Sequence, residues 1–236
     1  MHKTAMEIGA HFFRTYSSGT KLITIADIGS QDVNGSLRSL APVESKYVGL
    51  DFANGKGVDV LINDPYSLPI ESDSVDVVVS SSCFEHSEFF WLLFNDIQRI
   101  LKPHGLFYLN APSNGTFHRY PADCWRFYPD SGTALQNWAR RSGYETTLLE
   151  SFTGMQKMET WNDFIAVFIK DPSFINLYPR RIIDSYRDFT NGLKYGSDEL
   201  INPARRPEDQ RKPFGKVLKN KVKKLIPKRV RKSLGN

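Results

Sequence analysis

The sequence has few cysteines and no long apolar run, and both shortages exclude classes of protein. Its 236 residues include only two cysteines, Cys83 and Cys124, and neither belongs to a Cys-x-x-Cys pair. A disulfide framework and a cysteine-based zinc site are therefore not expected. No apolar stretch approaches the ~20 residues of a membrane-spanning helix, and the N-terminal residues lack the apolar run of a signal peptide. We therefore expect a soluble, cytoplasmic protein.

The composition is that of an ordinary globular protein. Hydrophobic residues make up 40% of the chain and charged residues 24%, with 16 Phe, 10 Tyr and 4 Trp. Disordered and collagen-like chains do not have this composition. The length favours one sizeable domain with an appendage. No internal repeat is present, so a solenoid is not expected.

The net charge of +5 is unevenly distributed along the chain. Residues 205–236 contain 13 basic and 2 acidic residues, whereas residues 1–204 contain 18 basic and 24 acidic ones. This asymmetry indicates a separate electrostatic role for the basic tail, toward phosphate-rich partners or an anionic membrane.

Two interpretations of the basic tail stay open: an amphipathic helix at the inner face of a membrane, or a solvated terminus. Nucleic acid is disfavoured as a partner, because the rest of the chain is acidic and Phe214 is the only aromatic residue of the tail. The first interpretation rests on apolar residues that share one helical face among lysines, namely Val217, Leu218, Val222, Leu225 and Ile226.

Short β-branched runs alternate with helical segments and predict an α/β fold. We expect a Rossmann-like, doubly wound, mainly parallel seven-stranded sheet flanked by helices. The strands are predicted at residues 22–27, 46–51, 58–61, 75–80, 106–109, 144–149 and 161–170. Helices are predicted at residues 5–16, 88–101 and 130–141, with a short helical stretch from residue 36. This domain covers residues 1–170, followed by a helical extension (171–204) and the basic tail (205–236).

The turn after the first strand is the first candidate ligand site. Gly29 permits close approach of the backbone to a ligand, and Gly35 permits a tight start of the next helical stretch. A nicotinamide-dependent oxidoreductase is disfavoured, because the Gly-x-Gly-x-x-Gly pattern is incomplete and two acids, Asp27 and Asp32, lie where a pyrophosphate would bind. A cationic or zwitterionic ligand fits this turn better.

Two further acids follow later strands. Asp51 ends the second strand, 24 residues after Asp27, at the spacing of an acid that binds a ribose diol. Asp64 precedes the fourth strand and can accept a hydrogen bond from an amino group such as adenine N6. Each acid alone also fits an ordinary turn or helix cap. Together they predict a nucleoside ligand that carries an amino acid moiety.

At this point the sequence resembles the class I S-adenosylmethionine-dependent methyltransferases, in particular the methyltransferase type 11 group. The resemblance covers about residues 20–170 and consists of six segments in the order of that family. These are Asp27–Gly29, Gly49–Asp51, Asp64 with Leu68–Pro69, Val75–Ser80, Phe84–His86 and Leu101–Gly105.

The resemblance implies S-adenosyl-L-methionine as cofactor. In such enzymes Asp27 and Gly29 would line the methionine portion, Asp51 would bind the ribose hydroxyls, and Asp64 would contact the adenine. The complete implied cofactor site consists of Asp27, Gly29, Ser30, Asp51, Asp64 and Ser80.

The long loop at residues 111–129 is the predicted acceptor site. It resembles the corresponding loop of methyltransferases associated with bacterial cell-surface glycan biosynthesis. An imidazole titrates near neutrality, so His118 is the candidate base for a hydroxyl acceptor, with Asp123 to orient or replace it. His118 also fits an ordinary loop histidine. The predicted acceptor contacts are aromatic rings and guanidinium groups, at Arg119, Tyr120, Trp125 and Arg126.

The sequence therefore predicts an enzyme that methylates a hydroxyl of a small molecule or glycan precursor. The alternative is a non-catalytic scaffold that keeps the fold and the cofactor pocket within a membrane-associated glycan-assembly complex. No metal site is predicted, because Glu85 and His86 are adjacent in sequence and adjacent residues seldom chelate one ion.

Overall fold

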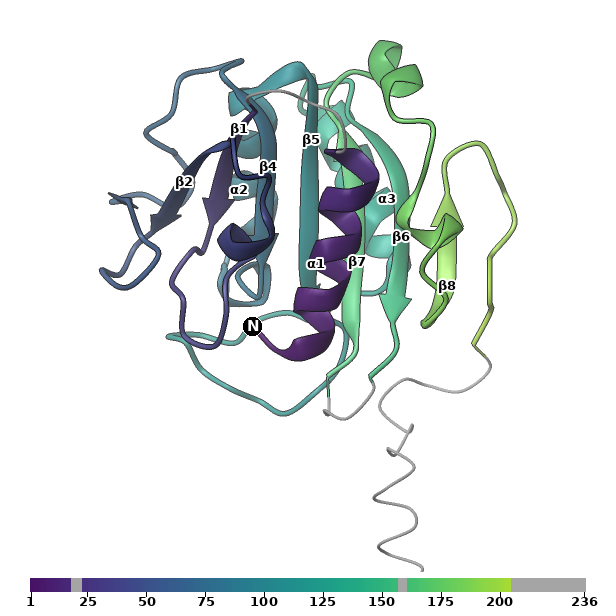
Figure 1. Cartoon of the computed structure of the whole chain (residues 1–236), viewed down its shortest axis with the longest axis horizontal. Helices are drawn as coiled ribbons and strands as arrows, with labels where there is room; N and C mark the ends of the chain where they lie inside the picture. The colour runs from purple at the N-terminus through teal and green to yellow at the C-terminus, as the bar shows by residue number, and fades with distance from the viewer. Residues whose placement is uncertain (18–22, 157–160, 205–236) are drawn as a thin grey trace, which may run out of the picture.

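In the computed structural model, the described residues 1–17, 23–156 and 161–204 form one eight-stranded sheet with helices on both faces (Figure 1). The strand order is β3-β2-β1-β4-β5-β7-β6-β8. The strands are β1 (Thr24–Ile28), β2 (Lys46–Asp51), β3 (Val60–Leu61), β4 (Val75–Ser81), β5 (Leu101–Pro112), β6 (Thr147–Gly154), β7 (Asp163–Ile169) and β8 (Phe189–Lys194).

The first five strands run parallel, which brings their carboxyl ends to one edge of the sheet. Asp27 of β1, for example, lies in register with Gly49 of β2 and Val79 of β4. Strand β7 is antiparallel to β5 and β6, and β8 is antiparallel to β6. The predicted Rossmann-like, mainly parallel sheet is thereby confirmed.

The predicted number of seven strands is wrong, because β8 adds an eighth strand beside β6 (Figure 1). The segment 171–204 was expected to be helical. It consists instead of two 3₁₀ helices, Pro172–Leu177 and Ile182–Asp184, followed by β8. Strand β8 contains Asn191 and Gly192, which are poor strand formers, so its pairing with β6 and the burial of Phe189 determine its conformation.

Two helical layers cover the sheet (Figure 1). Helices α2 (Phe90–Ile100) and α3 (Pro129–Arg141) lie on one face, where Phe94 packs against Phe107 and Phe168. Helix α1 (Lys3–Tyr16) covers the other face, and its Phe12 ring lies 4.6 Å from the ring of Tyr108 on β5. Buried aliphatic and aromatic side chains form a hydrophobic cluster on each face, so the sheet is buried on both sides.

The crossover after β1 contains only a 3₁₀ helix, Leu37–Leu40, as the short helical stretch predicted from residue 36. Its Leu37 packs directly on Gly9 of α1, where an added Cβ would lie 2.4 Å from the Leu37 side chain. Helix α1 and this short turn therefore share the covering of the β1 face.

No helix in the described part of the chain is long and apolar enough to cross a membrane. Cys83 and Cys124 are both free thiols, as the sequence predicts. The basic tail lies outside the described residues.

Candidate functional site

A cavity of about 350 Å³ lies at the carboxyl ends of β1, β2 and β4, where ligands bind in doubly wound sheets. Beneath this edge the loop between β5 and α3 passes close to the N-terminus of the chain (Figure 1). Several predicted site residues line the cavity: Asp27, Gly29, Ser30, Asp51, His118 and Tyr120.

The turn after β1 is shaped by Gly29. Its φ is +80°, and an added Cβ would lie 2.6 Å from Cβ of Cys83. The backbone N–H groups of Gly29 and Ser30 both donate to the carbonyl of Leu50, at 2.9 and 3.1 Å. The turn therefore folds tightly across β2 and leaves the space above it open to a ligand.

Asp27 is one of the buried acids that line the cavity. Its carboxylate accepts a hydrogen bond of 2.7 Å from the Tyr47 hydroxyl, and burial raises the pKa of Asp27 to about 6. No basic side chain forms an ion pair with Asp27 among the described residues, so a cationic ligand group would stabilise its charged form. Asp32, by contrast, pairs with Lys56 at 2.6 Å.

Asp51 presents two oriented carboxylate oxygens at the end of β2. Oδ2 accepts from the backbone N–H of Gln31 and Oδ1 from that of Ala53, both at 3.1 Å. Each oxygen retains acceptor capacity, as binding of two neighbouring hydroxyls requires.

Two predicted cofactor residues do not line the cavity. Asp64 is exposed, and its side chain accepts from the backbone N–H of Tyr66. Ser80 is buried and donates to the carbonyl of Ile28 at 2.9 Å. The roles assigned to these two residues stay predictions.

In the loop after β5, Asp123 fixes His118. The Asp123 carboxylate accepts from the backbone N–H of His118 at 2.7 Å and lies 3.3 Å from its Nδ1. Arg126 donates to both oxygens of the same carboxylate, at 2.5 and 2.8 Å, and lowers the pKa of Asp123 to about 2. Asp123 therefore stays ionised and holds His118 at the cavity.

The predicted acceptor residues differ in position. The Tyr120 hydroxyl donates to Oε1 of Gln31 at 3.3 Å, which links the loop to the β1 turn. Trp125 donates to the carbonyl of Ser87 at 2.9 Å and does not line the cavity. Arg119 donates to the carbonyl of Pro121 at 3.2 Å, and Arg126 is bound by Asp123.

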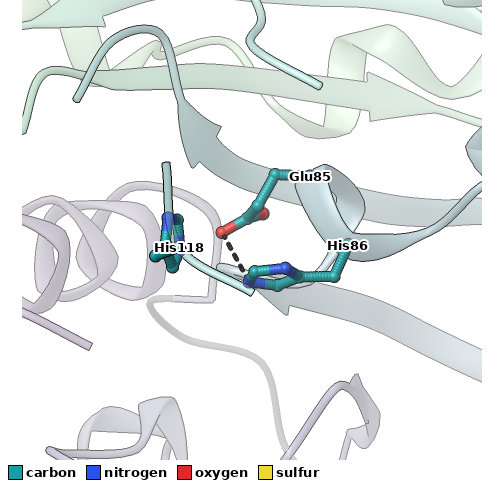
Figure 2. Close-up of side chains that lie close together, drawn as sticks. All are labelled: Glu85, His86 and His118. Carbon is teal, nitrogen blue, oxygen red and sulfur yellow. Dashed lines mark ion pairs between the residues drawn. The ribbon is translucent and has the colours of Figure 1, made fainter. Parts of the chain in front are cut away.

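A second group of ionisable side chains, Glu85, His86 and His118, meets at the cavity wall (Figure 2). Nε2 of His86 lies 3.6 Å from Oε1 of Glu85, and the rings of His86 and His118 meet edge to face with centroids 5.0 Å apart. Burial raises the pKa of Glu85 to about 8 and lowers that of His86. The side chains of these two adjacent residues thus face each other.

The residues around this site are similar in sequence to a known family. Residues 29–109 match the family model described as a methyltransferase domain. This part of the chain is therefore similar to a methyltransferase domain. In sequence, no curated protein matches the chain.

Solved structures of methyltransferases share the fold of this chain. A Galdieria sulphuraria protein assigned as a sarcosine dimethylglycine methyltransferase is 14% identical, with a TM-score of 0.53 over 70% of this chain and 85% of its own. The 1,6-didemethyltoxoflavin-N1-methyltransferase of Burkholderia thailandensis is 12% identical, with a TM-score of 0.52 over 71% and 78%. The CurJ carbon methyltransferase is 12% identical, with a TM-score of 0.50 over 71% and 54%. At these identities the likeness establishes the fold.

The match to a methyltransferase domain supports S-adenosylmethionine as the cofactor. The cavity fits it chemically: Asp27 is a buried acid that forms no ion pair within the described part of the chain, and Asp51 offers two acceptors to a diol. Ser30 lies beside them in the same lining.

The sequence alone does not point to several residues that line the cavity. Phe52 lines the cavity, and its position directly after Asp51 is the sequence feature that could have predicted this. His2, Trp161 and Asp163 come from distant segments, and His2 contacts Asp163 through a 3.0 Å hydrogen bond. Only the packing of α1 and β7 on the same edge brings them to the cavity.

Proposed function

We propose that this chain transfers a methyl group from S-adenosylmethionine to a hydroxyl of a small-molecule or glycan-precursor acceptor. The observation that carries the proposal is His118, a cavity-lining imidazole held by the ionised Asp123. The fold does not select the acceptor atom, since it also serves a carbon methyltransferase and an N1-methyltransferase. The choice of a hydroxyl therefore rests on this imidazole.

The proposed reaction is a direct displacement. The acceptor oxygen attacks the methyl carbon, the carbon–sulfur bond breaks, and its electron pair goes to sulfur. Nδ1 of His118 lies 3.2 Å from the carbonyl of Thr116 and 3.3 Å from Asp123, so it carries the proton. Nε2 therefore has a lone pair to accept the proton of the acceptor hydroxyl.

Aromatic side chains at the cavity support a sugar-like acceptor. Tyr120 and Trp161 line the cavity beside His118, and the His118 and Trp161 ring centroids lie 4.9 Å apart. Flat aromatic faces pack well on the apolar faces of sugar rings. We keep Arg119 and Trp125 as proposed acceptor contacts, and Arg126 as the residue that positions Asp123.

A cellular setting completes the proposal. We propose that the enzyme acts in the cytoplasm on a precursor of polysaccharide biosynthesis, with the basic tail at the inner face of a membrane. The support is the charge asymmetry of residues 205–236.

The first test is calorimetric titration with S-adenosylhomocysteine, with NAD as a control ligand. Wild type should bind saturably, Asp51→Ala should lose at least tenfold in affinity, and the exposed control Asp198→Asn should bind as wild type. No binding by folded wild type would refute the cofactor site.

The second test is methyl transfer to candidate hydroxyl acceptors. General base catalysis contributes about 10²–10⁴-fold, so His118→Ala should lose that much kcat while keeping cofactor affinity. Unchanged kcat in His118→Ala would refute the role of His118, and absent turnover with every hydroxyl acceptor would favour the scaffold.

A further inference from the structure

The wall of the cavity brings three potential metal ligands together: Glu85, His86 and His118 (Figure 2). The ligand atoms of the three side chains all lie within 4.8 Å of one another. Nε2 of His86 and Oε1 of Glu85 are 3.6 Å apart. Two ligands bound at about 2.1 Å to a tetrahedral ion are about 3.4 Å apart, so this pair already has the spacing of a chelate.

Nδ1 of each histidine contacts a backbone carbonyl, as is usual for metal-binding histidines. Nδ1 of His86 contacts the carbonyl of Ala122, and Nδ1 of His118 faces the carbonyl of Thr116 at 3.2 Å. In such contacts Nδ1 carries the proton and donates it, which leaves the Nε2 lone pair for a ligand. Metal-bound histidines are oriented by the same kind of contact with a carbonyl or carboxylate.

Glu85 supplies the independent observation that points to a cation. Its side chain is 1% exposed, and Oε2 has no hydrogen-bond partner among the described residues. A buried carboxylate without a partner is costly unless a positive charge compensates it. The nearby guanidinium of Arg126 is hydrogen-bonded to both oxygens of Asp123, so it acts on Glu85 only from a distance.

We propose that Glu85, His86 and His118 bind one divalent transition-metal ion, such as Zn²⁺, with open coordination positions facing the cavity. Two imidazole nitrogens and one carboxylate oxygen are a typical donor set for these ions, whereas Mg²⁺ and Ca²⁺ prefer oxygen ligands alone. The three donors leave at least one position open for the acceptor.

This inference rests on the proposed function and deepens it. An acceptor hydroxyl bound to the ion has a lowered pKa and releases its proton to solvent water. The resulting oxyanion then attacks the methyl carbon, and the carbon–sulfur electron pair goes to sulfur. In the ion-loaded enzyme His118 is a ligand, and the ion takes over the role that the free imidazole has without it.

The experiment measures ion binding by the full-length chain in the absence of cofactor. Protein stripped with a chelator is titrated with Co²⁺ and with Zn²⁺, and the bound metal is counted by elemental analysis. Visible absorption bands of bound Co²⁺ report its ligand geometry. We expect one ion per chain, and at least a tenfold loss of affinity in Glu85→Gln and in His86→Gln.

A matched control is His104→Gln, since His104 lies on β5, outside the cavity lining, and contacts Asp76 at 3.2 Å. It should bind the ion as wild type does. Far-UV circular dichroism and thermal unfolding like those of wild type show that each variant is folded. Equal ion affinity of wild type and His86→Gln, or no stoichiometric binding by wild type, would overturn the metal site.

His86→Gln also separates the two proposals, because it keeps His118 as a free base. Methyl transfer that needs the ion and is lost in His86→Gln supports the metal site. Ion-independent transfer that persists in His86→Gln overturns the role of the ion in the reaction and leaves the proposed function standing. Ion binding without methyl transfer to any hydroxyl supports the metal site and overturns the proposed function.

Discussion

Gly29→Ala tests whether the close packing of the β1 turn is a condition for a stable cofactor site. Alanine would have to adopt the left-handed backbone conformation of Gly29, at φ +80°. Its methyl group would lie 2.6 Å from Cβ of Cys83. The backbone alone costs about 1–2 kcal/mol for a non-glycine residue. The overlap with Cys83 adds about 1–3 kcal/mol, as is usual for overpacking.

Gly143→Ala is the matched control for that prediction. Gly143 has a similar φ of +93°, but an added Cβ would meet no atom within 4 Å. We therefore expect about 1–2 kcal/mol of destabilisation in Gly143→Ala and about 2–5 kcal/mol in Gly29→Ala. For a domain of this size each 1 kcal/mol lowers Tm by about 2–4 °C.

The assay is thermal unfolding of both variants beside wild type, followed by titration with S-adenosylhomocysteine below the lower Tm. Gly29→Ala should lose more stability and more affinity for S-adenosylhomocysteine than Gly143→Ala, because residues of the displaced turn line the cavity. Equal losses of Tm in the two variants would show that the overlap with Cys83 costs nothing, and would refute the reasoning.

Two further predictions concern a buried charge and the tail. Because burial raises the pKa of Asp27 to about 6, the native ligand-free protein binds a proton more tightly than the unfolded chain, and stability should fall as pH rises from about 4 to 6. In urea titrations at pH 4 to 7, Asp27→Asn should lack that loss, which amounts to about 3 kcal/mol; parallel pH profiles would contradict it. The full-length chain should sediment with anionic liposomes, whereas a chain ending at residue 204 should not; equal sedimentation would exclude the tail as the membrane contact.

The parts of the site that follow strand ends were predictable from the sequence. Asp27, Gly29 and Asp51 lie together because the carboxyl ends of parallel strands meet at one edge, and the sequence shows where those strands end. Asp64 and Ser80 lie off the cavity, because a position relative to a motif does not fix the direction of a side chain.

Tertiary packing determined what the sequence left open. Strand β8 forms although Asn191 and Gly192 disfavour a strand, since pairing with β6 outweighs local propensity. Trp161 reaches the cavity from the segment just before β7, and an added Cβ at Gly115 would lie 2.0 Å from its ring. No periodicity in the sequence reports such a contact between distant segments.

The Glu85–His86 pair shows how local conformation changes a chemical inference. Adjacent residues in a strand point to opposite faces, which is why neighbours in sequence rarely bind one ion. These two lie in the 3₁₀ helix Phe84–His86, directly after β4, and there their side chains converge to 3.6 Å. The same loop that holds His118 through Asp123 brings the third donor to them. The cluster can therefore serve as a base or as a metal site. The variant His86→Gln removes a metal ligand and leaves His118 as the base, so it distinguishes the two.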